Sequence, residues 1–206
     1  DIQNKDRVDV ILANPPFGGG EQTQVQENFP IKSGETAYLF LQHFIKKLKA
    51  RGRAGIIIKN TFLSNSDGKF LRKELLETCN LHTILNLPQK VFTAGVKTIV
   101  LFFEKGTPTK KIFYYDLNLE RNLGLTNPLT ENDLKEFIDL YTSKKEGLNS
   151  WSKNIKDVNK ETWDLSVDNP NKKEIIDNRT PTDIISEIEK LNKQGTEALK
   201  KIKELL

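Results

Sequence analysis

The feature that most constrains the fold is an apolar run near the start of the chain that ends at an asparagine and two prolines. The run Val8–Ala13 (VDVILA) is almost entirely apolar, and Asn14–Phe17 (NPPF) follows directly. A short, continuous apolar run bounded by a turn is typical of a strand that is buried on both faces. Proline has no N–H to donate to a sheet, so the strand ends there. We predict a central strand over residues 8–13.

Helices and strands alternate beyond this strand. Apolar residues recur at helical spacing between Ala37 and Leu48, where Gly52 is placed to end the helix, and a second apolar run follows at 54–58. A right-handed crossover would lay these two strands parallel. The alternation continues with an expected helix at 67–79 and strands at 81–87, 98–104 and 111–115, the first two of which pair as neighbours. The pattern indicates a doubly wound α/β fold with a mostly parallel sheet.

The α/β part is assigned to residues 1–118, and a more polar region follows it. Residues 119–179 are predicted to form a mixed extension and linker. Trp151 and Trp163 within this region are expected to anchor it onto the core, because an indole ring buries a large apolar area.

The last region, residues 180–206, is predicted to be a helical extension. Thr180 supplies an N-cap, Pro181 occupies the first helical position, and Asp183 adds an acid to the first turn. Apolar residues then recur at alternating spacings of four and three, interrupted by Gly195, at Ile184, Ile188, Leu191, Ala198, Ile202 and Leu205. Such a heptad pattern favours packing against another helix. The sequence leaves open whether that partner lies in the same chain or in another one.

The composition excludes several kinds of site. The formal net charge of +4 permits nucleic-acid binding without demonstrating it, and the scarcity of arginine relative to lysine argues against base-by-base readout by this chain. The single cysteine, Cys79, can form neither a disulfide nor a zinc cluster and is predicted to be a small buried residue. His43 and His82 lack partners at metal-ligand spacing, so we predict structural roles for both and no metal site. No apolar run approaches the roughly 20 residues of a membrane span, so we expect a cytoplasmic protein.

The candidate catalytic residues are Asn14, Pro15, Pro16 and Phe17. In an open α/β sheet, ligands bind beyond the carboxyl ends of the strands, where this segment would lie. The side-chain oxygen of Asn14 and the main-chain carbonyl of Pro15 could each accept one hydrogen of a planar amino group, and the two prolines fix the direction of that carbonyl. Phe17 offers an aromatic face to a base that has swung out of a duplex. A methyl donor such as S-adenosylmethionine would supply the transferred group, without a metal or a covalent intermediate. If the motif served only to end the strand, the two prolines would be explained but Phe17 would not.

The segment Asn14–Gly19 (NPPFGG) resembles the catalytic motif of the modification subunits of type I restriction-modification systems. Further stretches resemble this family in order and spacing, namely Gly52–Gly55, Asn80–Ile84, Leu87-Pro88, Gly95–Thr98, Val100–Phe103, Pro128–Thr130 and Trp163–Ser166. The resemblance extends to about residue 170. It implies the Rossmann-like fold of S-adenosylmethionine-dependent methyltransferases and site-specific adenine-N6 methylation of double-stranded DNA.

The resemblance also implies partners. In that family two modification subunits join a specificity subunit that recognises the DNA sequence, and the restriction subunit is a further candidate partner. The heptad helix resembles the helices through which such subunits contact their partner.

One departure from the family pattern concerns the methyl donor. The family's glycine-rich donor-binding loop precedes the catalytic motif, whereas only residues 1–7 precede it here. We therefore expect this chain to carry the catalytic half of the fold, to expose a sheet edge beside its first strand and to be inactive in isolation. Asn14 is the only donor-binding residue that we assign within it.

Two other functions stay open from the sequence. Methylation of RNA or of a protein glutamine amide would use the same motif, because the motif suits any planar NH2 group. A non-catalytic subunit that docks through its terminal helix would need only the last region.

Overall fold

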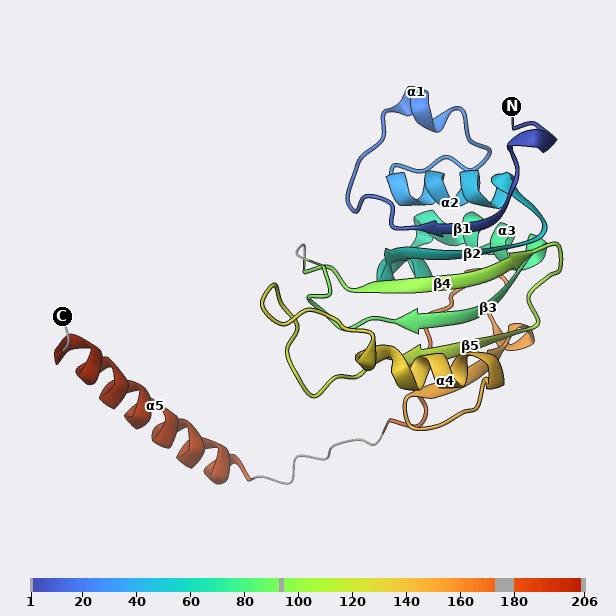
Figure 1. Cartoon of the computed structure of the whole chain (residues 1–206). Coiled ribbons are helices and arrows are strands. Elements are labelled where there is room, and N and C mark those ends of the chain that lie inside the picture. The colour runs from blue at the N-terminus through green and yellow to red at the C-terminus, as the bar shows by residue number, and fades with distance from the viewer. Residues whose placement is uncertain (1, 93–94, 173–179, 205–206) are drawn as a thin grey trace. The chain divides into compact units, whose positions relative to one another are not determined.

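The computed structural model describes residues 2–92, 95–172 and 180–204. Residues 1–172 and 173–206 form two separate compact units. Within its described residues, the first unit holds a six-stranded sheet in the order β1-β2-β4-β3-β5-β6 (Figure 1). The strands are β1 (Val8–Ala13), β2 (Leu48–Lys59), β3 (Cys79–Asn86), β4 (Thr98–Lys105), β5 (Lys111–Asp116) and β6 (Ser150–Asn154). The helices are α1 (Thr23–Gln26), α2 (Thr36–Lys47), α3 (Lys69–Thr78) and α4 (Lys135–Ser143), and the second unit contributes α5 (Pro181–Glu204).

The sheet is mixed. β1 pairs parallel with β2 and β3 pairs parallel with β5, while β4 lies antiparallel between β2 and β3 and β6 lies antiparallel to β5. Strands β1, β2, β3 and β5 therefore share one direction, and β4 and β6 oppose it. The predicted pairing of the strands at 81–87 and 98–104 is confirmed, and it is antiparallel because the short connection between them holds no crossover helix in its described residues.

The prediction that residues 8–13 form a central strand buried on both faces is wrong. β1 lies at one end of the strand order, and Leu12 is 81% exposed. Side chains alternate between the two faces of a strand, so Ile11 and Ala13 pack on the main core while Val10 and Leu12 face the other side. The expected exposed sheet edge beside this strand is confirmed.

Two hydrophobic clusters cover the two faces of the sheet. The helices α2 and α3 pack on one face, where Leu41, Ile45 and Leu75 are completely or almost completely buried. The helix α4 covers the β3–β5 side of the other face, where Phe137 packs against Leu85 and its neighbours (Figure 1). The part of that face over β1 and β2 carries no helix of the described residues.

The helix α2 ends earlier than the sequence indicated. It stops at Lys47, and Gly52 lies inside β2 rather than at the helix end. Arg51 takes a positive φ of 64°, and a Cβ on Gly52 would lie 2.9 Å from the Lys49 carbonyl oxygen. Gly52 is therefore needed for a tight irregularity in the strand.

Both tryptophans anchor the polar region onto the core, as predicted. Trp151 stacks on Tyr114 with ring centroids 5.4 Å apart, and Trp163 is buried. Arg72 of α3 holds the second anchor in place: its guanidinium donates to the carbonyl oxygens of Trp163, Thr162, Phe62 and Asn65 at 2.6–2.9 Å. A buried cation thus finds carbonyl partners in place of water.

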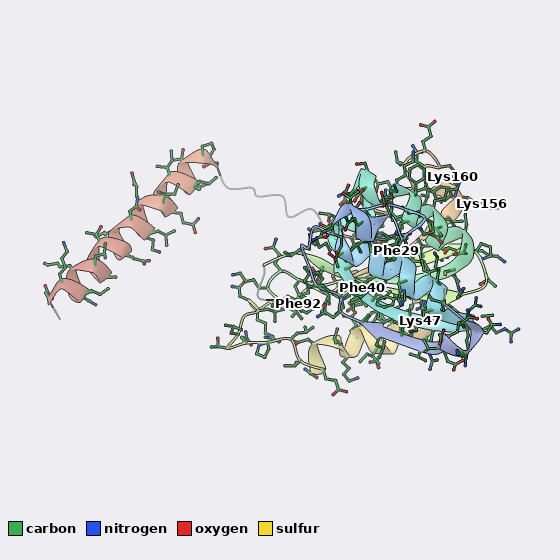
Figure 2. All side chains as sticks on the ribbon, turned by 90° about the horizontal axis from the view of Figure 1, so that it is seen from above. Phe29, Phe40, Lys47, Phe92, Lys156 and Lys160 are labelled. Carbon is green, nitrogen blue, oxygen red and sulfur yellow. The ribbon has the colours of Figure 1, made fainter. Side chains whose placement is uncertain are left out.

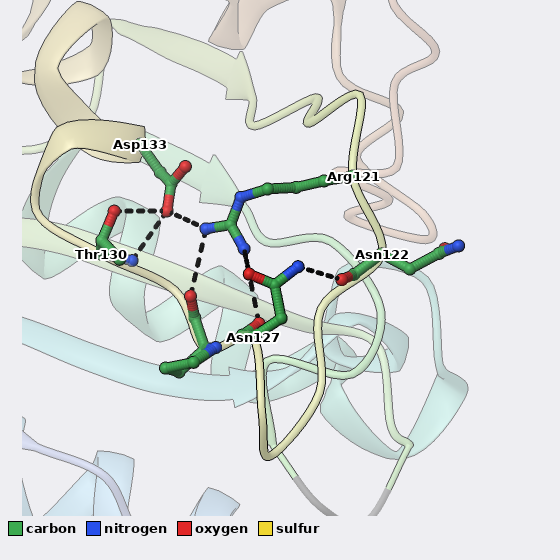
Figure 3. A network of polar contacts seen from close by, with 6 residues as sticks. Arg121, Asn122, Asn127, Thr130 and Asp133 are labelled. Carbon is green, nitrogen blue, oxygen red and sulfur yellow. Dashed lines mark hydrogen bonds and ion pairs between the residues drawn. The ribbon is translucent and has the colours of Figure 1, made fainter.

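The segment that leads into α4 is closed by a polar network (Figure 3). Arg121 forms an ion pair with Asp133 and donates to the Asn127 carbonyl oxygen at 3.4 Å. Asp133 also accepts from the main-chain N–H and the hydroxyl of Thr130, each at 2.7 Å. The Thr130 hydrogen bonds, followed by those of Arg121, lower the pKa of Asp133.

The second unit contains α5, whose predicted N-terminal cap is confirmed. Asp183 accepts from the Thr180 N–H at 2.9 Å, and its own N–H donates to the Thr180 hydroxyl at 3.2 Å, which is a reciprocal capping arrangement. Within α5, Ile188 and Leu191 of the heptad are more than half exposed, and Leu205 lies outside the described residues. In the described ranges no helix combines the length and the apolar character of a transmembrane span.

Candidate active site

The motif Asn14–Phe17 lies at the carboxyl end of β1. Because β1, β2, β3 and β5 share one direction, their carboxyl ends meet along one edge of the sheet. Pro15 is buried, while the Asn14 side chain is exposed and makes no hydrogen bond within the described residues. The amide oxygen of Asn14 is therefore free to accept a hydrogen from a ligand. The catalytic roles of Asn14, Pro15, Pro16 and Phe17 stay predictions.

Glycines directly after the motif allow a close approach to the start of α2. Gly18 has a φ of +80°, which favours glycine, and a Cβ on Gly19 would lie only 2.4 Å from the Thr36 hydroxyl oxygen. That hydroxyl donates to the Gly19 carbonyl oxygen at 3.1 Å, and the Thr36 N–H donates to the same oxygen at 3.3 Å. The first turn of α2 thus fixes the segment that follows Asn14–Phe17.

An ion pair lies next to the same segment. Lys59, the last residue of β2, donates to both carboxylate oxygens of Glu35 at 2.9 and 3.1 Å. The two side chains are only 21% and 30% exposed, so this pair is partly shielded from solvent. A Cβ on Gly18 would lie 3.9 Å from the Lys59 ammonium nitrogen. Sequence reasoning missed Lys59, although its place at the end of a predicted strand was a usable signal.

Phe17 has an aromatic neighbour that the sequence did not reveal. The rings of Phe17 and Phe92 meet edge to face, with centroids 5.4 Å apart and an interplanar angle of 63°. Phe92 also packs on the hydrophobic cluster beneath α4, so it links the motif to that cluster. Figure 2 shows Phe92 at the end of the first unit toward which β1 points. The only sequence signal was an apolar pair, Val91-Phe92, in a turn-rich segment.

A polar hollow of about 370 Å³ lies along the same edge of the sheet. Asn60, Asn86, Lys97 and Asp116 contribute to its wall, and Asn14 does not line it. Asn86 donates to the Asp116 carboxylate at 2.6 Å, whereas its own amide oxygen is buried without a partner in the described residues. This edge therefore offers hydrogen-bonding groups beyond the motif itself.

The residues that were predicted to be structural lie away from this edge or inside the core. Cys79 is fully buried, as predicted. His82 lies on β3, where burial, followed by the nearby charge of Lys144, lowers its pKa to about 4. Its neutral ring packs edge-on against Tyr141 with centroids 5.8 Å apart. His43 lies on α2, and desolvation, followed by Lys47 and Lys46, lowers its pKa.

Comparison with known proteins places this geometry in a family. The family model described as N-6 DNA Methylase matches residues 1–179. The type I restriction enzyme EcoEI methylase subunit of Escherichia coli is 33% identical over 98% of this chain and 44% of its own length. The chain thus spans less than half the length of this curated relative.

Solved structures agree with the sequence comparison. A modification subunit assigned to a type I restriction enzyme of Vibrio vulnificus YJ016 is 32% identical, covers 85% of this chain and 41% of its own, and superposes with a TM-score of 0.78. A structure on complex assembly and conformational transition of the type I restriction-modification system is also 32% identical. It covers 98% of this chain and 46% of its own with a TM-score of 0.74. The expected methyltransferase fold is confirmed.

Proposed function

The chain belongs to the N-6 DNA methylase family, and on that premise we propose that it carries the adenine-binding part of a site-specific adenine-N6 DNA methyltransferase of a type I restriction-modification system. The observation that carries this proposal is the free Asn14 side chain, which is exposed at the carboxyl edge of the sheet directly before buried Pro15. Among the described residues this amide has no hydrogen-bond partner, so its hydrogen-bonding capacity is available to a substrate.

Asn14 and Pro15 act on the amino group of the target base. The N6 lone pair of adenine is delocalised into the ring, so the nitrogen is a poor nucleophile until it becomes pyramidal. Asn14 accepts one N6 hydrogen through its side-chain oxygen and Pro15 accepts the other through its carbonyl oxygen. These two acceptors stabilise the geometry in which the lone pair points at the incoming methyl group.

Phe17 and Phe92 provide the apolar surroundings of the extruded base. A base that leaves the duplex loses its stacking partners, and contact with an aromatic side chain is worth about 1–3 kcal/mol. The edge-to-face contact at 5.4 Å holds the Phe17 ring in one orientation before any ligand arrives. The two rings thereby reduce the reorganisation that base binding requires.

The methyl donor of this reaction is S-adenosylmethionine, which supplies an electrophilic methyl group for in-line displacement by the amine nitrogen. Among the described residues we assign only Asn14 to the donor site, because the strand that precedes it, β1, lies at a free edge of the sheet and exposes Leu12. We place the remaining donor contacts in the part of the longer relatives that this chain does not match.

The partners follow from the same premise. Type I methylases act as subunits, and we propose that α5 contributes its heptad face to a contact with a specificity subunit in an assembly that includes a second modification subunit. The restriction subunit is a further partner of that assembly. The proposed double-stranded DNA substrate agrees with the expected cytoplasmic location.

The proposal is tested by labelled-methyl transfer with the longest polypeptide that the gene encodes, assembled with its specificity subunit. DNA, RNA and protein are offered as acceptors in parallel, and the Asn14→Ala variant is compared with Asn154→Ala. Asn154 is a matched control because it is exposed at the far end of β6. We expect transfer to DNA, a loss of about a hundredfold or more for Asn14→Ala and no loss for the control. Transfer only to RNA or protein, or full activity of Asn14→Ala, would refute the proposal.

A further inference from the structure

A lysine-rich hollow lies at the opposite edge of the sheet from Asn14–Phe17. Asn80 is the second residue of β3 and Lys111 is the first residue of β5, so the hollow lies at the amino ends of strands whose carboxyl ends carry the candidate active site. Its volume is about 430 Å³. Its wall includes the three lysines Lys110, Lys111 and Lys144, together with His82 and the polar side chains of Asn80, Thr107 and Ser152. None of the described carboxylates contributes to the wall.

Lys144 is the unusual member of this set. Its ammonium nitrogen lies 3.9 Å from the centroid of the Tyr141 ring and 5.4 Å from that of Phe113, and it donates to the Thr83 hydroxyl. It forms no ion pair within the described residues. Burial alone lowers the pKa of Lys144 to about 8. A cation that has lost water and gained no counter-charge is electrostatically unsatisfied.

The position of Lys144 in the chain is also unusual for this residue type. It follows the last turn of α4 with a φ of 52°, a left-handed conformation that glycine and asparagine adopt more easily. The backbone therefore gives no reason for a lysine here. The contacts of its side chain with Tyr141, Phe113 and Thr83 direct the amine toward β3 and the hollow.

We propose that this hollow binds a phosphate group through Lys144, with Lys110 and the polar side chains of Asn80 and Thr107 completing the site. A phosphate oxygen would supply the counter-charge that Lys144 lacks, and the neutral donors of the wall would take the remaining oxygens. Glu146 at the rim pairs with Lys111 at 3.3 Å and accepts a hydrogen bond from Ser152, so we assign neither of these two residues a direct contact with the phosphate. The phosphate belongs either to a small phosphomonoester or to a nucleic-acid backbone.

The charges that face Lys144 define how binding depends on pH. His82 of β3 is neutral above pH about 4, and Tyr141 of α4 is neutral because burial raises its pKa. Lys111 and Glu146 form a pair at the rim, while Arg53 and Glu104 line the neighbouring hollow that Lys144 also borders. Lys144 is thus the one group among these that changes charge near pH 8.

A bound phosphate favours the charged form of Lys144 and therefore raises its pKa. Above pH 8 the unliganded amine loses its proton, so binding must take a proton up. The affinity should then fall about tenfold for each pH unit between pH 8 and the pKa of the complex. Phosphomonoesters titrate near pH 6, so their own charge is constant over this range.

The test follows the side-chain ¹³Cε resonance of Lys144 in the whole chain while methyl phosphate or a short DNA duplex is added. The variants are Lys144→Asn, which suits the left-handed backbone, Lys144→Arg, which keeps the charge at all these pH values, and Lys145→Gln, which removes the adjacent exposed charge. Circular dichroism verifies that each variant is folded.

We expect saturable shifts at Lys144, an affinity that weakens above pH 8, and a loss of at least tenfold in Lys144→Asn. Lys144→Arg should bind without the pH dependence, and Lys145→Gln should lose no more than about twofold. A response to methyl phosphate identifies a small ligand, and a response to the duplex alone identifies a backbone phosphate. Absence of saturable binding by both probes, or equal binding by wild type and Lys144→Asn, overturns the proposal. The methyl-transfer activity does not bear on this result.

Discussion

Replacing Gly19 by alanine should displace the candidate catalytic segment without unfolding the protein. The added Cβ would lie 2.4 Å from the Thr36 hydroxyl oxygen, and real Cβ contacts essentially never fall below 3.0 Å. The segment after Phe17 must then move by at least about 0.6 Å, or the Thr36 hydroxyl must rotate and give up its hydrogen bonds to Gly19 and Glu21. Overpacking of this kind costs about 1–3 kcal/mol of stability.

The expected loss of activity is larger than the loss of stability suggests. A misplacement approaching 1 Å near reacting groups lowers the rate by up to about a hundredfold. We therefore expect kcat/KM for methyl transfer by the complete enzyme to fall about 10- to 100-fold in Gly19→Ala. Urea unfolding of the chain should show a decrease of about 1–3 kcal/mol.

Two further variants serve as a control and as a rescue for this prediction. Gly20→Ala is the matched control, because a Cβ on Gly20 meets nothing within 4 Å and should leave activity and stability unchanged. Thr36→Ala combined with Gly19→Ala removes the clashing oxygen and should recover part of the lost activity. If Gly19→Ala were as active as Gly20→Ala, the close approach to α2 would not position the motif.

Three further predictions follow from other parts of the structure. Arg72→Met should lower the free energy of unfolding by about 3–5 kcal/mol in urea, because four carbonyl oxygens lose the charged donor that Arg72 provides, while exposed Lys73→Met should change it little. The fold lowers the pKa of Asp133, so the stability that this carboxylate contributes is present above the ordinary pKa of 3.8 and is lost as the pH falls through the lowered pKa. The amide resonance of Thr130 should therefore shift as acid protonates Asp133. Asp133→Asn should abolish this shift. Phe92→Ala should weaken the binding of an extruded base about tenfold or more, which a fluorescent base analogue at the methylated position would report.

The sequence predicted those features that depend on neighbouring residues. The cap formed by Thr180 and Asp183 was foreseen because its partners are three residues apart. The alternation of helices and strands, and the motif at the end of β1, were likewise local patterns. The sequence could not predict the edge position of β1. An apolar run indicates that both faces of a strand are to be buried, but it does not show which segments pair with the strand or pack on it.

Contacts between distant residues explain the remaining differences. Phe92 reaches Phe17, and Lys59 reaches Glu35, only through the order of strands in the sheet. Lys144 reads as an ordinary polar residue after a helix until the fold places Tyr141 and Phe113 around its amine. Side-chain environment of this kind depends on topology, for which residue type and periodicity supply no direct signal.

The central claim is that the Asn14 amide acts on the amine in the reacting state, and single-turnover methylation by the complete enzyme measures this most directly. The claim predicts that Asn14→Ala lowers the rate of the chemical step about a hundredfold or more while the dissociation constant for DNA changes by less than about threefold. Equal single-turnover rates for Asn14→Ala and wild type, or a loss that arises entirely from weaker DNA binding, would contradict it.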